Sequence, residues 1–163
     1  MGVSLFLLFF IVSCTGFLLG WKKNSNGLIL AKTKIGTSKD LKEWLPLDSL
    51  HTLALQAAAK LHPTSKPQLK RIDVRKEKGT VKFIFENYCG IQIDGATGNV
   101  LFHESRTSDL LENIHDGSII DYLLGTSGWF KLLYTSIMGI ALLLFTVTGF
   151  WLWYGPKRMR KDN

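Results

Sequence analysis

The stretch from Leu132 to Pro156 contains no charged residue, and it constrains this chain more than any other feature. A helix of that length can span a hydrocarbon core of about 30 Å. The basic cluster Lys157–Lys161 follows at once, and such clusters mark the cytoplasmic side of a membrane span. The sequence therefore predicts a transmembrane helix over residues 129–155 and a basic cytoplasmic tail over residues 156–163.

A second apolar run opens the chain and predicts another transmembrane helix over residues 2–21. The residues Ile11-Val12-Ser13-Cys14 resemble a lipoprotein cleavage box, so lipidation of Cys14 is an alternative. A retained anchor is favoured, because no Lys or Arg precedes the run and the run continues past Cys14 to Trp21. Two spans place both termini in the cytoplasm of a bacterial inner membrane, with the polar middle outside it, in the periplasm of a Gram-negative source.

The net charge of +7 is divided between the middle of the chain and the membrane-flanking cluster after it. No basic stripe with interleaved aromatic residues is present, which argues against nucleic acid and favours lipid headgroups as the partner of these charges. The two cysteines predict no disulfide, since Cys14 lies in the first span and Cys89 in the middle domain. Cys89 shares strand parity with Ile91 and Ile93, so we expect a small buried apolar residue.

The middle of the chain predicts a juxtamembrane linker over residues 22–44, including a possible short strand over 28–33, and then an α+β domain over residues 45–106. A helix over residues 47–61 is predicted because its apolar residues recur at i, i+3, i+4, i+7, i+8 and i+11. These residues are Leu50, Leu53, Ala54, Ala57, Ala58 and Leu61.

The apolar period then changes to two, which predicts three or four antiparallel strands joined by hairpins. The predicted strands are residues 70–76, 80–86, a strand through Cys89, Ile91 and Ile93, and residues 99–103. We expect the helix to pack on one face of this sheet, formed by Val81, Phe83, Phe85, Ile91 and Ile93. The fold class is therefore α+β: one helix on a small sheet, flanked by two transmembrane helices.

Residues 107–128 predict two short helices at the membrane interface. Ser108 and Ser118 are candidate caps, and Ser118 with Asp121 has the spacing of a capping box. Gly117 ends the first helix, and the second has an apolar face formed by Ile119, Ile120, Leu123 and Leu124.

Several segments together resemble the PepSY-associated transmembrane family, in the short two-span form common in Bacteroidetes. They are the helix-plus-sheet pattern, the hairpin Ile91–Leu101, the sequence Ile114-His115-Asp116-Gly117-Ser118 and the closing Val147–Trp153. The resemblance covers nearly the whole chain and implies a PepSY-like fold for the middle domain. Such proteins commonly carry a basic, His-bearing stretch before the first helix. This sequence lacks that stretch, so a start codon upstream of Met1 is expected.

Larger relatives with more spans resemble siderophore-iron reductases, whose histidines bind haem at helix ends. Of the four histidines, the resemblance implies only His115 as a cofactor-binding residue, for haem b. A bis-imidazole haem needs two such residues, and a role as helix-end cap or hinge remains the favoured alternative for His115. We interpret His51, His62 and His103 as surface or boundary residues of the domain.

No catalytic residue and no metal ligand set is predicted, because the sequence has no metal-binding motif, phosphate loop or nucleophile elbow. Gly16 and Gly20 form a Gly-x-x-x-Gly pair, and Gly139 and Gly149 lie on the second span. Small residues let helices approach closely, so we interpret these four as helix-packing positions.

Two functions remain open from the sequence. The favoured one is a non-catalytic accessory module, since PepSY-like domains resemble protease propeptides that hold or restrain a partner. The alternative is a subunit or degenerate relative of a haem-dependent siderophore-iron reductase, with a role in iron uptake. Either function implies the lipid bilayer and a membrane or periplasmic protein, or a second copy of the chain, as partners.

Overall fold

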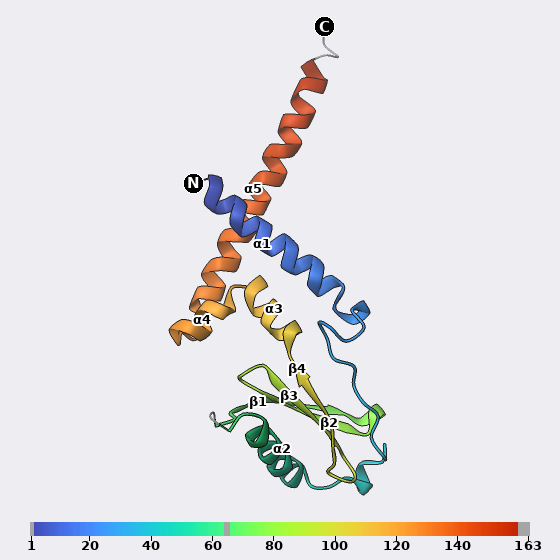
Figure 1. Cartoon of the computed structure of the whole chain (residues 1–163). Coiled ribbons are helices and arrows are strands. Elements are labelled where there is room, and N and C mark those ends of the chain that lie inside the picture. Colours follow the sequence, from blue (N-terminus) through green and yellow to red (C-terminus); the bar gives the residue numbers. More distant parts are fainter. Residues whose placement is uncertain (1, 64–65, 160–163) are drawn as a thin grey trace. The chain divides into compact units, whose positions relative to one another are not determined.

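The computed structural model describes residues 2–63 and 66–159, which belong to two compact units. The sheet unit is Leu18–Leu111, and the helical unit combines residues 1–17 with residues 112–163. Figure 1 labels the α-helices and the strands. In chain order the elements, including three short 3-10 helices (η), are α1 (Gly2–Gly20), η1 (Lys22–Asn24), η2 (Leu41–Glu43), α2 (Leu47–Leu61), β1 (Leu69–Arg75), η3 (Lys76–Lys78), β2 (Thr80–Phe85), β3 (Cys89–Asp94), β4 (Val100–Ser105), α3 (Thr107–His115), α4 (Ser118–Leu124) and α5 (Trp129–Met159).

The four strands form one antiparallel sheet in the order β1-β2-β3-β4, which confirms the predicted α+β class. The two central strands, β2 and β3, are buried along their whole length, so both faces of the sheet are covered there. In the register of these strands Phe83 is opposite Ile91 and Val81 is opposite Ile93. Directly opposite residues point to the same face, and these four side chains therefore form one apolar surface.

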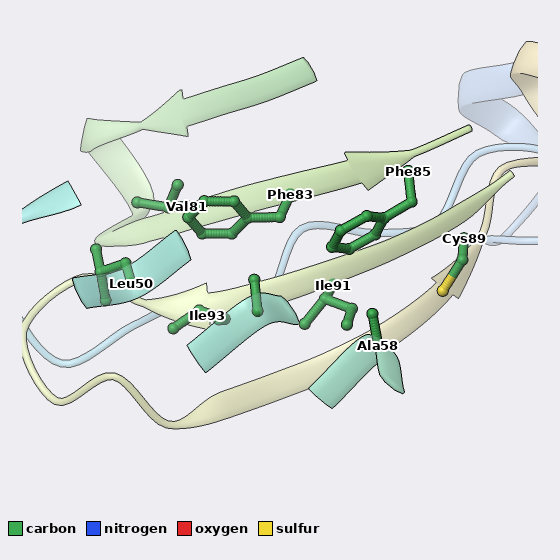
Figure 2. Packing of buried hydrophobic residues seen from close by; sticks show 9 residues of the cluster. Leu50, Ala58, Val81, Phe83, Phe85, Cys89, Ile91 and Ile93 are labelled. Carbon is green, nitrogen blue, oxygen red and sulfur yellow. The ribbon is translucent and has the colours of Figure 1, made fainter. Parts of the chain in front are cut away.

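Helix α2 covers this apolar face, with the bounds that its periodicity predicts (Figure 2). Leu50 and Ala54 are completely buried, and they pack in one cluster with Phe83, which is also fully buried. The predicted core face is therefore confirmed. Cys89 belongs to the same cluster, and burial raises the pKa of its thiol, as expected for a residue that behaves as a small apolar side chain.

The opposite face of the sheet is covered by residues 28–38, where no strand forms although residues 28–33 were predicted as a possible strand. The backbone N–H of Lys34 donates to Oε1 of Gln92 (2.8 Å), and Nε2 of Gln92 donates to the carbonyl of Lys32 (3.1 Å). The hydroxyl of Thr80 donates to the carbonyl of Lys34 (2.9 Å). The strand prediction is wrong because sheet side chains, and not a strand ladder, satisfy this backbone.

Two glycines let this covering segment approach the turn between β1 and β2. Gly79 has φ +68°, and a Cβ atom at Gly36 would lie 2.1 Å from the carbonyl oxygen of Gly79. The next residue, Thr37, donates both its N–H and its hydroxyl to the carboxylate of Asp94. Burial raises the pKa of Asp94, but hydrogen bonds from Thr37 and from backbone N–H groups outweigh it and hold the pKa below its ordinary value.

In the helical unit, α5 is the one described helix that is long and apolar enough to cross a membrane, over Trp129–Lys157. The helix continues to Met159, so its end does not coincide with the predicted boundary at residue 156. Pro156 lies inside the last turns, where its missing N–H costs one helical hydrogen bond. Residues 160–163 of the predicted tail lie outside the described residues.

Helix α1 is apolar and uncharged, but its described apolar stretch, Leu5–Gly20, is shorter than a span requires by length alone. Within the helical unit Phe9 of α1 meets Phe145 of α5 edge-to-face, with ring centroids 5.5 Å apart. The second predicted span is therefore present as a helix, and its crossing of a membrane remains a proposal.

Candidate functional site

His115, the residue singled out by its motif, is the last residue of α3 and contacts helix α1 inside the helical unit. Its Nδ1 lies 2.9 Å from the hydroxyl oxygen of Thr15. The same hydroxyl is placed to donate its one proton to the carbonyl of Ile11 (2.7 Å), and in that arrangement Nδ1 is the donor toward Thr15. In this tautomer Nε2 carries the lone pair of the imidazole.

The small residue next to Thr15 makes room for the imidazole. A Cβ atom at Gly16 would lie 3.2 Å from Cε1 of His115, closer than most Cβ contacts. Gly16 thus contacts a side chain of α3. Nothing lies within 4 Å of a Cβ atom built at Gly20, Gly139 or Gly149, and a helix-packing role for these three stays a prediction.

The turn after His115 is held by Asp116. Its carboxylate accepts hydrogen bonds from the N–H and the hydroxyl of Ser118 and pairs with Lys131 at the start of α5. Burial raises the pKa of Asp116, but the hydrogen bonds from Lys131 and Ser118 outweigh it, so the pKa lies below its ordinary value. Gly117 occupies the left-handed region with φ +77°, and a Cβ atom there would lie 2.8 Å from the ring of Tyr134.

Asp121 caps helix α5, which differs from the predicted capping box with Ser118. Its carboxylate accepts from the N–H groups of Phe130 (3.1 Å) and Lys131 (2.8 Å), in the first turn of α5, and from the hydroxyl of Thr126. The hydrogen bond from Thr126 is the main cause that lowers the pKa of Asp121. A carboxylate satisfies orphan N–H groups at any helix start it reaches, and here it reaches the following helix.

A second polar constellation, which the sequence analysis missed, is buried in the sheet unit on the face opposite α2. Oε2 of Glu104 accepts from Nζ of Lys82 (3.1 Å) and Nε2 of Gln92 (2.6 Å), and Oε1 accepts from Nη1 of Arg106 (2.9 Å). Arg106 also forms a fork with Asp109 of α3. These five residues are called the Glu104 cluster below.

The Glu104 cluster is internally balanced. The Glu104 side chain is 1% exposed and those of Lys82 and Arg106 are 4% and 8% exposed, so the charges neutralise one another away from water. Burial alone would lower the pKa of Arg106, and its hydrogen bonds to Asp109 and Glu104 raise it above the ordinary value. Lys82 and Gln92 have the strand parity opposite to Phe83 and Ile91, but Glu104 lies beyond the predicted strand 99–103. The missing signal was the segment that excludes water from them.

The other three histidines belong to the sheet unit. The ring of His51 stacks on Phe83 with centroids 6.0 Å apart, and its Nε2 is buried without a hydrogen-bond partner. His62 follows the end of α2, and His103 is an exposed residue within β4. Among residues 2–63 and 66–159, no group of three or more His, Cys, Asp or Glu side chains is placed to hold a metal ion.

Comparisons with known proteins agree with the resemblance that the sequence motifs carry. No match was found among curated proteins or among solved structures. The family described as the PepSY-associated TM region matches residues 1–162, which is nearly the whole chain. The chain therefore belongs to the PepSY-associated TM region family.

Proposed function

We propose that this protein crosses the inner membrane twice and displays its sheet unit outside the cytoplasm as a non-catalytic interaction module. Its family and the apolar helix α5 make it a membrane protein. The two spans, the orientation and the accessory role are the proposal. The uncharged helix α1, the basic cluster after residue 156 and the polar domain between the two helices support it.

The observation that carries the membrane part of the proposal is the exposure of the apolar side chains of α1 and α5. In α5, Leu143 is 68% exposed and Trp151 is 69% exposed, and in α1 Phe6 is 65% exposed. Exposed apolar surface of this extent is unfavourable in water, whereas lipid tails cover it without cost. Both helices therefore require a lipid environment or a partner helix.

Helix α4 supports an interfacial position for residues 107–128. Leu123 and Leu124 are 74% and 67% exposed, and Trp129 beside them is 73% exposed. Leu124 and Trp129 line an apolar cavity of about 230 Å³ together with Phe130. Tryptophan at a helix start, next to exposed leucines, is typical of the boundary between headgroups and acyl chains.

The interaction role is supported by how the sheet unit uses its polar groups. The buried charges of the Glu104 cluster are paired with one another, so they stabilise one fold and are not presented to a substrate. The surface of the sheet unit is then the part available to a partner. That partner is a membrane or periplasmic protein, or a second copy of this chain.

Cysteine labelling in intact cells tests the topology. In a Cys14→Ser background, Lys66→Cys is predicted to react with a membrane-impermeant maleimide before the inner membrane is opened. The matched control Lys157→Cys is predicted to react only after the membrane is opened. The Cys14→Ser variant with no introduced cysteine measures any background labelling of Cys89. The reverse pattern, with Lys66→Cys protected until the membrane is opened, overturns the proposed orientation.

One observation favours the second candidate, haem binding as in an iron reductase. Nδ1 of His115 lies 2.9 Å from the hydroxyl oxygen of Thr15, and histidines that bind metal through Nε2 commonly donate their other N–H to a neighbouring oxygen. His115 could therefore hold a haem iron through Nε2. The helical unit supplies no second histidine, because His115 is the only one in residues 1–17 and 112–163. A haem here would supply one-electron redox chemistry.

An absorption spectrum of the full chain, purified after expression with haem supplementation, separates the two candidates. The interaction-module proposal predicts no stoichiometric Soret band from the protein as given. A stoichiometric band that disappears in His115→Ala and weakens in Thr15→Val would replace that proposal with the haem protein. A band that persists in His115→Ala would mean that another residue binds the haem.

A further inference from the structure

A groove runs between the second half of α2 and strand β4. It consists of two adjoining cavities of about 300 Å³ and about 310 Å³, which share Leu61 and His103 as lining residues. Both cavities lie within the sheet unit. Together they extend along β4 from Val100 to Ser105, the full length of that strand.

Strand β4 offers a backbone edge beside this groove. It is the last strand in the sheet order, and β3 is its only strand neighbour among the described residues. An edge strand can pair with an added extended peptide, and the alternate side chains of that peptide then enter pockets beside the strand. The six residues of β4 match a peptide of about six residues, roughly 20 Å long.

The charges along the groove select the kind of peptide. Lys60, His62 and His103 line it, and all three side chains can donate hydrogen bonds. The acid that reaches its wall, Glu104, is already paired with Lys82 and Arg106 at 3.1 and 2.9 Å. The uncompensated charge of the groove is therefore positive.

The apolar part of the groove lies beside its basic part. Leu53 and Leu61 of α2 and Val100 of β4 line the first cavity, next to Lys60 and His103. Alternate residues of an added strand point to opposite faces of the sheet, so only every second side chain of the peptide enters the groove. With glutamates at those positions, the carboxylates reach the basic lining and the methylene groups pack against the apolar lining.

We propose that the groove between α2 and β4 binds an extended acidic segment of a partner protein by adding it as a strand to β4. This inference rests on the proposed interaction-module function and names the surface and the chemical class of the partner. Backbone hydrogen bonds to β4 supply the register, and Lys60, His62 and His103 supply the preference for carboxylates.

The experiment is a fluorescence-anisotropy titration of the full chain in phosphatidylcholine nanodiscs. The probe is fluorescein-labelled Glu-Val-Glu-Val-Glu-Val, and the controls are the Lys-Val-Lys-Val-Lys-Val peptide and an acidic probe N-methylated at alternate residues. We expect the acidic probe to bind at least tenfold more tightly than either control. Equal binding of the basic peptide, or no binding of the acidic probe, overturns the proposal.

A matched pair of charge reversals locates the binding. Lys60→Glu in the groove is predicted to weaken the acidic probe at least tenfold, whereas Lys70→Glu on the exposed side of β1 changes it less than twofold. Equal effects of the two variants would show that the binding depends on the net charge of the protein, and would contradict the groove as the binding site. Labelling of Lys66→Cys tests separately whether the sheet unit lies outside the cytoplasm. If that labelling is as predicted but the acidic probe does not bind, only the groove proposal fails, and the interaction module would use another surface.

Discussion

The two faces of the four-stranded sheet are both buried, but by different kinds of chemistry. On one face α2 covers an apolar cluster that includes Phe83, Ile91 and Ile93. On the other face residues 28–38 cover Thr80, Gln92 and the charges of the Glu104 cluster, and hydrogen bonds hold this cover in place.

The two faces differ in what they contribute to the fold: stability on one side, and the position of the covering segment on the other. The apolar face tolerates small shifts, because the hydrophobic effect depends on area and not on direction. The polar face admits one arrangement, since each buried donor or acceptor needs its own partner. The apolar face therefore supplies most of the stability, and the polar face fixes where the covering segment and α3 attach.

The largest expected effect is on the apolar face. Phe83→Ala removes a completely buried ring, and we expect the free energy of unfolding to fall by about 3–5 kcal/mol. Hydrogen exchange of the β2 and β3 amides in the full chain measures it. The control Val74→Ala, half-exposed on β1, should cost much less, and a loss below about 1 kcal/mol at Phe83 would show that the helix does not pack on this face.

Glu104→Gln tests the polar face at its centre. The neutral amide leaves Lys82 without its anionic partner and Arg106 with Asp109 alone, and we expect a loss of about 1.5–3 kcal/mol. Glu86→Gln at an exposed position is the matched control and should change the same amides little. If both variants behave alike, water reaches Glu104 and the two faces are not equivalent in burial.

Gln92→Leu separates the covering segment from the sheet. It leaves the carbonyl of Lys32 and the N–H of Lys34 without their partners, at an expected cost of about 1–3 kcal/mol. The faster exchange should appear first in residues 28–38, and only later in β2. Uniform acceleration across the whole sheet unit would instead mean that cover and sheet unfold as one.

The smallest expected effect depends on pH. The pKa of Asp94 is lower in the folded state, so its contribution is complete above the ordinary carboxyl pKa of about 3.9 and is lost as the pH falls below it. Thermal unfolding of wild type and Thr37→Val between pH 6 and 3 measures this. Thr37→Val should lower stability more at pH 6 than at pH 3, and a constant difference would exclude the Asp94 contact as its cause.

Sequence periodicity was sufficient to predict the elements that pack through apolar surface. The bounds of α2 and the core position of Phe83 follow from residue spacing alone, because burial of one face imposes the period. The Glu104 cluster did not follow, since a polar face reads as solvent-exposed until a segment from about sixty residues away covers it.

For the candidate site, the sequence identified His115 but not the residues that it contacts. Its motif singled it out, but the bond to Thr15 joins residues one hundred positions apart, and no local pattern indicates it. The assignment of Asp121 as part of a capping box with Ser118 was wrong for a related reason. Local spacing identifies a carboxylate that can cap, and the bend between α4 and α5 decides which helix start it reaches.

The length of α5 has a consequence for the surrounding lipid. Its uncharged stretch from Leu132 to Pro156 rises about 37 Å, against a hydrocarbon core of about 30 Å. If α5 crosses the membrane as proposed, its apolar length exceeds that of the core. The helix then tilts or the bilayer thickens around it, which makes the thickness of the host membrane a determinant of how this protein is sorted and held.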